Sequence, residues 1–537
     1  MRLLIKEYIL QLKEKDELDF LLCDLLFQKG YIMDNRPKTG NRQFGVDIRA
    51  YNDEEFLLCV VKQGDLRRKN WDSDQNAVRQ SLDEIKDCYI SSLTDKPQKK
   101  LRIAVVTNGE LDEAVRLNWD GYVSRNTNWD GLEVKIEFWG IDSVTHDVQE
   151  FLFDEHIFGK ELQGLLRKAL YFVGESDYRN VHFEKIIDAL LVDLEAKNTK
   201  LFRKRISGIY LASQMIAQFA ADEGIYKIGI MVSEYLIIRF WKYMLVNNCF
   251  EDSNYVEWLC KFTSAYDKWA LQYYNSVKYV CESREHFPAY NPVEQRVLLY
   301  EIIGYLTSYS YFLSFFCQEK KYLRNRVQQI YSSVVQLIDN NSMFFYPPYD
   351  IHAGIITMLL RLSDRLGNIA NIHALLNTQC CYTAFDYRMR KKYPSPIDSF
   401  EDAVNIYMGF PSESYQVSGF WGTMLEWLAL MGEEETYLEI QPILEVDLKE
   451  VTKCVWFLRS EEESLFYDTY AMNRAGEGVS VEIHDTFEKF KEAIDYMMQQ
   501  YSQEHFSFET YSFEALEFII CRYYNYLPRV KREEKMI

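Results

Sequence analysis

The stretch QFGVDIRAY at residues 43–51, the turn NDEE at 52–55 and the run FLLCVVK at 56–62 decide the fold of the N-terminal part of the chain. In residues 43–51, apolar and polar side chains alternate with the period of two that is typical of a strand. Residues 56–62 are apolar until the final lysine, as in a strand that is buried on both faces. Together they predict a β-hairpin with a four-residue turn.

The register of this hairpin determines which side chains share a face. If Tyr51 lies opposite Phe56, Asp47 lies opposite Val60. Because side chains alternate along a strand, Lys62 then shares the face of Val60 and lies diagonal to Asp47. A lysine that ends an apolar strand also requires a partner, since lysine is rarely buried without one. We therefore expect Asp47 and Lys62 to converge on one patch.

Helical and strand-like periods alternate on both sides of the hairpin. An amphipathic helix is expected to begin near Asp16 and to end at Gly30. Beyond the hairpin the periodicity predicts a helix over 77–90, a strand over 101–107, a helix over 110–118, a strand over 134–138 and a helix from about 142. This order predicts an α/β sandwich with a mixed sheet.

The remainder of the 537 residues is dominated by long apolar stripes with short polar joints, for example 206–219 and 351–366. No fixed repeat period is present, so a helical bundle and an irregular solenoid both remain open. The expected fold class is thus an α+β domain over residues 1–152, followed by a large all-α region over residues 153–537. A further boundary is expected near residues 390–400.

Composition and charge exclude several classes of protein. The net charge of −20 disfavours indiscriminate binding to nucleic acid. Basic side chains nevertheless concentrate between residues 36 and 69, so any DNA contact is expected there. The sequence contains no nucleotide-binding glycine loop, no G-x-S-x-G and no H-E-x-x-H, which leaves an ATPase, a serine hydrolase or a zinc protease unsupported.

The chain is expected to be soluble and cytoplasmic. Its eleven cysteines form no C-x-x-C pair, which disfavours a disulfide framework or a zinc ribbon. The first residues, MRLLIKE, become charged too early for a secretory signal. The most apolar long stretch, residues 228–246, contains Glu234, Arg239 and Lys242, so no membrane span is expected.

Several of these elements together resemble the core of the Mrr-like nucleases of the PD-(D/E)XK restriction-endonuclease superfamily. The residues that carry the resemblance are Glu17, Phe20, Leu25, Leu26, Gly30, Tyr31, the run Gly45-Val46-Asp47-Ile48 and the strand that ends in Lys62. The helix from about Ala77 and the strands around Val105 and Ile136 fit as well. The resemblance covers roughly residues 14–152.

The resemblance implies a metal-dependent DNA endonuclease with a restriction-endonuclease-like fold. Asp47 is then the principal metal ligand, with the backbone carbonyl of Val61, and Glu17 is the acid carried by the helix. Lys62 orients or activates the attacking water and neutralises developing charge. The metal is expected to be Mg²⁺ or Mn²⁺, because hard divalent cations bind carboxylate and carbonyl oxygens.

The chain departs from the family's pattern two residues before the lysine, where the family has Glu, Asp or Gln and this sequence has Val60. Asp65 or Glu17 could supply the missing carboxylate, or its role could pass to Gln63. In a regular strand Gln63 faces the wrong way, although Gly64 could mark a bulge that turns it. The departure concerns metal affinity and turnover more than the fold.

The basic residues Arg42, Arg67, Arg68 and Lys69 are the candidate DNA contacts, although a charge run such as 67–69 can also be merely solvated. The leading hypothesis is a restriction or anti-phage endonuclease, in which the helical region senses, regulates or assembles through a protein partner or a second copy. The competing hypothesis is an inactive nuclease fold that binds DNA or serves as a scaffold. A third hypothesis is a nuclease that acts on RNA.

Overall fold

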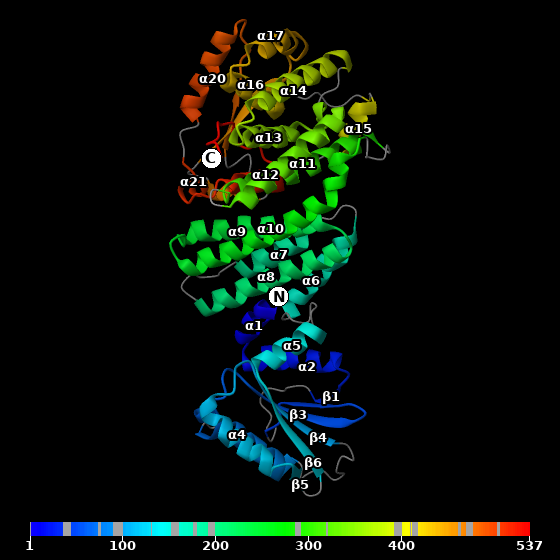
Figure 1. The fold of residues 1–537 in the computed structure, drawn as a ribbon, viewed down its shortest axis with the longest axis vertical. Coiled ribbons are helices and arrows are strands. Elements are labelled where there is room, and N and C mark those ends of the chain that lie inside the picture. The colour runs from blue at the N-terminus through cyan, green and yellow to red at the C-terminus, as the bar shows by residue number, and fades with distance from the viewer. Residues whose placement is uncertain are drawn as a thin grey trace. The chain divides into compact units, whose positions relative to one another are not determined.

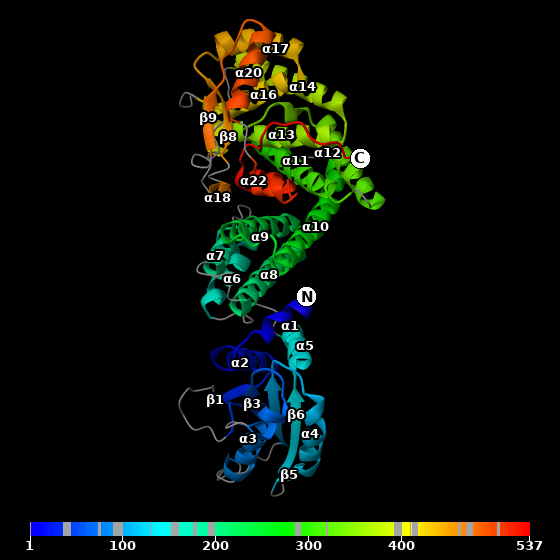
Figure 2. The same ribbon diagram turned by 90° about the vertical axis from the view of Figure 1, so that its left-hand side faces the viewer.

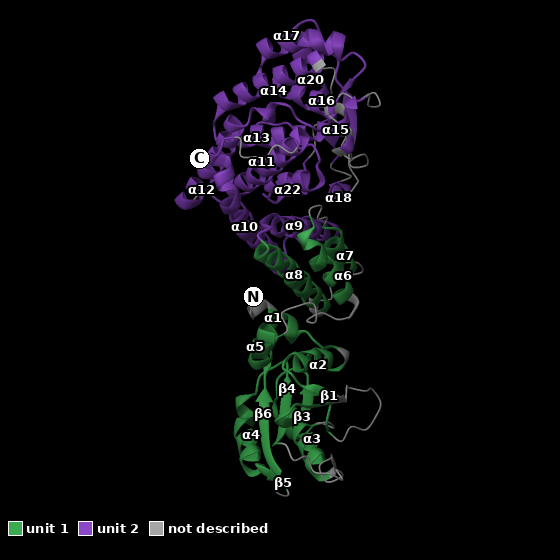
Figure 3. Cartoon of the chain, turned by 90° about the vertical axis from the view of Figure 1, so that its right-hand side faces the viewer, with its two compact units in different colours: residues 1–223 green, residues 224–537 purple. Residues whose placement is uncertain are grey.

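The computed structural model divides the chain into two compact units, residues 1–223 (unit 1) and residues 224–537 (unit 2), shown in Figure 3. It describes residues 2–35, 45–73, 77–89, 100–129, 132–151, 160–175, 180–191, 199–284, 291–317, 320–390, 400–408, 410, 417–459, 463–468, 476–501 and 505–536. The expected domain boundary at 152/153 stays a prediction, and unit 1 continues to Glu223. The expected boundary near 390–400 falls almost entirely outside the described residues.

Unit 1 is built on a mixed six-stranded sheet with the order β1-β2-β3-β4-β6-β5. Its strands are β1 (Ile32–Asn35), β2 (Ile48–Tyr51), β3 (Glu55–Lys62), β4 (Lys100–Thr107), β5 (Asn128–Trp129) and β6 (Leu132–Trp139). The central strands β3, β4 and β6 are parallel, and the β1/β2, β2/β3 and β5/β6 pairs are antiparallel. The predicted mixed sheet is therefore confirmed, and the short strands β1 and β5 were not anticipated.

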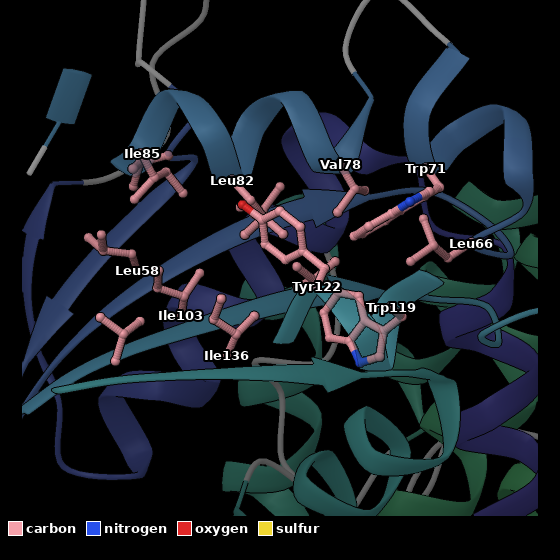
Figure 4. Packing of buried hydrophobic residues seen from close by; sticks show 14 of the residues in the cluster. Leu58, Leu66, Trp71, Val78, Leu82, Ile85, Ile103, Trp119, Tyr122 and Ile136 are labelled. Atoms are coloured by element: carbon pink, nitrogen blue, oxygen red, sulfur yellow. The ribbon is translucent and has the colours of Figure 1, made fainter. Parts of the chain in front are cut away.

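One face of this sheet packs against helices that connect its strands in sequence, as Figure 4 shows. These are α3 (Val78–Glu84), the π-helical turn η3 (Ile85–Tyr89) and α4 (Glu113–Arg125). Val78, Leu82 and Ile85, at helical spacing, contact the strand residues Leu58 and Ile103 in one buried cluster. The apolar stripe of the predicted helix over 77–90 therefore faces the core at these three positions. The side chain of Tyr89 lies outside the described part of the chain.

Three further helices of unit 1 lie together on the other side of the sheet (Figure 1). They are α1 (Arg2–Leu10), α2 (Asp19–Gln28) and α5 (Ile141–Phe151), and the π-helical turn η1 (Glu14–Leu18) leads directly into α2. Helix α2 contacts β1 and β2, and α5 contacts β6. The helix expected from Asp16 to Gly30 corresponds to η1 and α2, whereas α1 was not predicted.

Unit 1 also contains helices that follow the sheet in sequence, and these pack on one another. They are α6 (Lys160–Tyr171), the turn η6 (Phe172–Gly174), α7 (Val181–Leu191) and α8 (Thr199–Asp222). Helix α8 also contacts α1. These helices therefore join the compact unit that carries the sheet.

Unit 2 is mainly helical, as the apolar stripes predicted. Its long helices are α9 (Tyr226–Asn247), α10 (Ser253–Glu282), α11 (Pro292–Ser314), α12 (Lys321–Asn340), α13 (Ala353–Arg365), α14 (Ile369–Arg390), α16 (Gly419–Met431) and α20 (Phe487–Tyr501). Shorter helices and turns are η7 (Ser342–Phe345), η8 (Asp350–His352), α15 (Phe400–Met408), α17 (Glu434–Pro442), η9 (Ile443–Asp447), α18 (Glu463–Phe466), α21 (Ser507–Thr510) and α22 (Ala515–Tyr524).

The expectation that this region is all-α is corrected by a second sheet. It has the order β7-β8-β9, formed by β7 (Val417–Ser418), β8 (Thr452–Leu458) and β9 (Gly476–Ser480). Figure 2 shows β8 and β9 beside α16. Gly422 of α16 allows the close approach, because a Cβ there would lie 2.0 Å from the Cys454 carbonyl oxygen of β8. Within the described part of the chain, no helix is long and apolar enough to cross a membrane.

Candidate functional site

The candidate site lies where the β2–β3 hairpin opens. The observed pairs Tyr51–Phe56 and Ile48–Cys59 confirm the predicted register over residues 48–51. The expected pair of Asp47 with Val60 is not among them, and the core cluster holds Val46 together with Val60 instead. The regular ladder stops at Ile48. The Asp47 N–H still donates to the Cys59 carbonyl at 2.9 Å, and the Asp47 Oδ2 accepts a hydrogen bond from the Val61 N–H at 2.8 Å. The Asp47 carboxylate is therefore fixed against the end of β3.

Glycine is required at the start of the Gly45-Val46-Asp47 run. Gly45 has a φ of +79°, and a Cβ at this position would lie 2.3 Å from the Ser81 carbonyl oxygen of α3. Both the left-handed backbone and the close approach exclude a larger residue without strain. The next side chain, Val46, is buried in the core cluster. Asp47 is consequently held in place by the residues before it as well as by Val61.

The electrostatic surroundings of Asp47 oppose its ionisation. Burial raises the pKa of the Asp47 carboxyl, whereas the hydrogen bond from Val61 and the charge of Lys62 lower it. The negative charge of Glu14 raises this pKa further, and the net direction is upward. The charge of Lys15 lowers the pKa as Lys62 does, yet the two lysines do not outweigh burial, and a bound cation would add positive charge that favours the ionised carboxyl.

The helix-borne acid that acts on Asp47 is Glu14, a residue that the sequence analysis did not select. Both Glu14 and Glu17 lie on η1. Glu17 accepts a hydrogen bond from the Lys13 N–H at 2.7 Å and forms an ion pair with Lys204 of α8. Burial raises the pKa of Glu17, but these contacts outweigh it and leave the pKa below its ordinary value. The assignment of Glu17 to the metal stays a prediction, and its described partners are Lys13, which precedes η1, and Lys204 of α8.

Gln63 serves to hold the chain segment that precedes η1. Its Nε2 donates to the Leu12 carbonyl at 3.1 Å, and the buried Asn108 donates to the Leu12 and Ile9 carbonyls, both at 2.9 Å. Asn108 also accepts from the Gly64 N–H at 2.7 Å. Asn108 thus ties the ends of β3 and β4 to the approach to η1. The sequence signal for it was a polar pair, Thr107-Asn108, directly after a buried strand.

Val60 stands where the resemblance to PD-(D/E)XK nucleases leads one to expect Glu, Asp or Gln. Its side chain is fully buried in the apolar cluster between the sheet, α3 and α4. A carboxylate in this place would lose its hydration without gaining a partner. Asp65, one of the proposed substitutes, pairs with Arg67 at 3.0 Å and accepts from the Glu110 N–H at 3.0 Å. Glu14 is therefore the better candidate for a second acid.

Three of the four predicted DNA contacts lie among the described residues. Arg67, Arg68 and Lys69 are exposed on the segment that follows Lys62. Trp71, which follows this basic run, is buried in the core and makes edge contacts with Trp119 and Tyr122. The prediction for Arg42 falls outside the described residues.

The donor set suits a hard cation that keeps part of its water shell. Among the described residues, no group of three His, Cys, Asp or Glu side chains is arranged to hold a metal ion. The candidate oxygen donors are the Asp47 carboxylate, the Glu14 carboxylate whose charge acts on it, and the Val61 carbonyl that the resemblance implies. Mg²⁺ is commonly bound through only one or two carboxylates, with water or substrate phosphate completing the shell. The residues present therefore fit Mg²⁺ and do not fit zinc.

Comparisons with known protein families, with curated protein sequences and with solved structures found no significant match to this chain.

Proposed function

We propose that unit 1 is a metal-dependent nuclease that hydrolyses phosphodiester bonds in DNA. The observation that carries the proposal is the position of Asp47, whose buried carboxylate binds the Val61 N–H and is influenced by both Lys62 and Glu14. An acid pair, a backbone carbonyl and a lysine at one strand end are the groups that the resemblance to PD-(D/E)XK nucleases implies. The order of helices and strands in unit 1 supports a restriction-endonuclease-like fold.

The residues of the site have separate tasks in this reaction. Asp47, Glu14 and the Val61 carbonyl would hold Mg²⁺ or Mn²⁺, which when bound supplies a Lewis acid and lowers the pKa of a bound water. The half-buried Lys62 ammonium lies close enough to stabilise Asp47 as an anion. In the presence of DNA it would neutralise negative charge that develops on the phosphate. Gln63 and Asn108 position the segment that leads into Glu14.

The substrate would approach over the segment that follows β3. Arg67, Arg68 and Lys69 are exposed there and can contact phosphates without reading sequence. This arrangement would let an acidic chain bind DNA locally. Restriction of foreign DNA is the biological context that the resemblance implies, with unit 2 sensing, regulating or assembling the nuclease.

Cleavage of supercoiled plasmid in Mg²⁺ or Mn²⁺ tests the proposal. Asp47→Asn and Lys62→Met should each lower the cleavage rate at least about 100-fold, the usual scale for losing one electrostatic or acid–base contribution. Asp53→Asn in the hairpin turn and Lys100→Met at the exposed start of β4 remove the same charges away from the site and should cleave as the wild type does. Equal cleavage by all five proteins would refute the proposal.

A second function is favoured by Val60 and by the small donor set. A nuclease fold without a third acidic ligand could bind DNA without cutting it and serve as a DNA-binding or scaffolding subunit. In that case DNA binding would persist in EDTA and in Asp47→Asn, and plasmid would stay intact with either metal. Competition with RNA in the same assay would show whether RNA is the preferred substrate.

A further inference from the structure

A cavity of about 270 Å³ lies inside unit 2, between α16, β8, α20 and the C-terminal segment 527–531. Its lining combines apolar and polar groups, and the aromatic residues Trp456, Phe457, Tyr501 and Phe506 belong to it. Small-molecule sites are usually concave and apolar, with a few polar groups that fix the ligand. The volume suits a compact ligand.

One buried carboxyl group lines this cavity without a partner. Glu426 lies on α16, and only 5% of its surface is exposed. Within the described part of the chain, no hydrogen bond or ion pair reaches its carboxyl group, and burial raises its pKa to about 8. An unpaired buried carboxyl costs free energy, so its presence works against the stability of the unit.

The other charged side chains of the lining, Arg529, Lys531 and Glu509, all have ion-pair partners. Arg529 contacts Glu509 at 2.9 Å and Glu517 at 3.1 Å, and Lys531 contacts Glu509 at 3.2 Å. The remaining ionisable lining groups are the Tyr501 hydroxyl and His505, which is exposed. Glu426 is thus the charged lining residue that has no ion pair or hydrogen bond within the described part of the chain.

The wall formed by the C-terminal segment is fixed by buried ion pairs. Arg532 donates twice to Asp364 of α13, each at 2.8 Å, and the fully buried Arg361 contacts Glu533 at 2.6 Å and Glu517 at 2.9 Å. Figure 2 shows this red segment running past α13. A wall held in this way presents a preformed site, which reduces the entropy lost when a ligand binds.

We propose that this cavity binds an organic cation, a protonated amine carried on a compact aromatic or aliphatic body. The ammonium pairs with the Glu426 carboxylate, and the body packs on the aromatic side chains, whose faces also attract cations. The site lies wholly in unit 2 and uses no residue of the nuclease site, so the failure of either proposal leaves the other intact.

Titration calorimetry of the full chain with matched probes tests this proposal. Benzylamine and tryptamine carry an ammonium, benzyl alcohol and tryptophol replace it by a hydroxyl, and indole-3-acetate reverses the charge. At pH 7.5 we expect at least one amine to bind ten or more times more tightly than its alcohol, and indole-3-acetate not to bind. Absence of binding by both amines, or binding of indole-3-acetate as tight as that of tryptamine, would overturn the proposal.

A conservative variant separates the carboxylate from the rest of the cavity. Glu426→Gln removes a buried charge and should fold at least as stably as the wild type, while lowering amine affinity about tenfold or more and leaving the affinity for the alcohol unchanged. Glu434→Gln, at an exposed position of α17, is the control and should bind as the wild type does. Unchanged amine affinity in Glu426→Gln would contradict the assignment.

Proton release provides a readout that a purely structural role for Glu426 would not give. With a pKa of about 8, the carboxyl is mostly protonated at pH 7, and pairing with an ammonium favours its ionised form. Amine binding should therefore release up to one proton at pH 7, detected as a binding enthalpy that differs between Tris and phosphate, and this difference should vanish in Glu426→Gln. Amine binding with no proton release in the wild type would overturn the proposal.

Discussion

Replacing Gly45 by alanine would place a Cβ atom 2.3 Å from the Ser81 carbonyl oxygen of α3. The three atoms nearest the new methyl group all belong to the Ser81 backbone, which cannot move aside as a flexible side chain would. The φ of +79° at this position adds a conformational cost for any L-residue. Gly45→Ala therefore perturbs both the core contact and the segment that positions Asp47.

The expected loss of stability follows from these two costs. A left-handed backbone costs an L-residue roughly 1–2 kcal/mol, and overpacking typically costs about 1–3 kcal/mol. Unit 1 should lose about 2–5 kcal/mol of unfolding free energy in Gly45→Ala. Gly30→Ala is the matched control, because Gly30 has a φ of +85° but no atom within 4 Å of the new Cβ. Gly30→Ala should lower the unfolding free energy only by the conformational cost. The change in the entropy of the unfolded chain is the same in both variants.

Amide hydrogen exchange of β4 measures the difference in unfolding free energy between Gly45→Ala and Gly30→Ala. The amides of this buried central strand exchange mainly when unit 1 unfolds. The additional cost of about 1–3 kcal/mol corresponds to exchange about 5 to 150 times faster in Gly45→Ala than in Gly30→Ala. Equal exchange rates in the two variants would refute the contact between Gly45 and Ser81.

Three further predictions follow from the same structure. Glu14→Gln should lower metal-dependent cleavage at least about tenfold more than Glu17→Gln, and plasmid cleavage rates in Mn²⁺ that rank the two variants the other way would contradict the placement of Glu14. Val60→Glu should lower the unfolding free energy of unit 1 by about 3 kcal/mol or more without raising its activity. Hydrogen exchange measures the stability and plasmid cleavage measures the activity. A variant that cleaves faster at unchanged stability would contradict this prediction. Arg361→Met leaves Glu517 buried without its main partner and should cost unit 2 about 3–5 kcal/mol, whereas an unchanged thermal unfolding temperature would show that the pair adds no stability.

Much of unit 1 could be predicted from the sequence because its signals are local. The alternation in residues 43–51 and the apolar run 56–62 specify the hairpin and its register. Short or glycine-rich strands carry no such signal: β5 has two residues, and β9 reads GEGVS. Helix α16 and strand β8 meet at Gly422, a contact that no local pattern reveals.

The candidate site was predicted in part, for a similar reason. The sequence predicts that Asp47 and Lys62 lie close together, and the charge of Lys62 does act on Asp47, although the expected pair of Asp47 with Val60 is not formed. The choice between Glu14 and Glu17 depends on how η1 packs against the sheet and α8. The core position of Val60 depends on helices that come later in the chain. The Glu426 cavity depends on elements that are distant in sequence and meet only in the folded unit.

Whether Asp47 and Glu14 hold a divalent cation is measured most directly by Mn²⁺ titration of the full chain, with free Mn²⁺ followed by electron paramagnetic resonance. The wild type and Asp53→Asn should bind one Mn²⁺ with the same affinity, and Asp47→Asn and Glu14→Gln should each weaken that affinity about tenfold or more. Binding by Asp47→Asn that equals binding by Asp53→Asn would contradict a metal site at the hairpin opening.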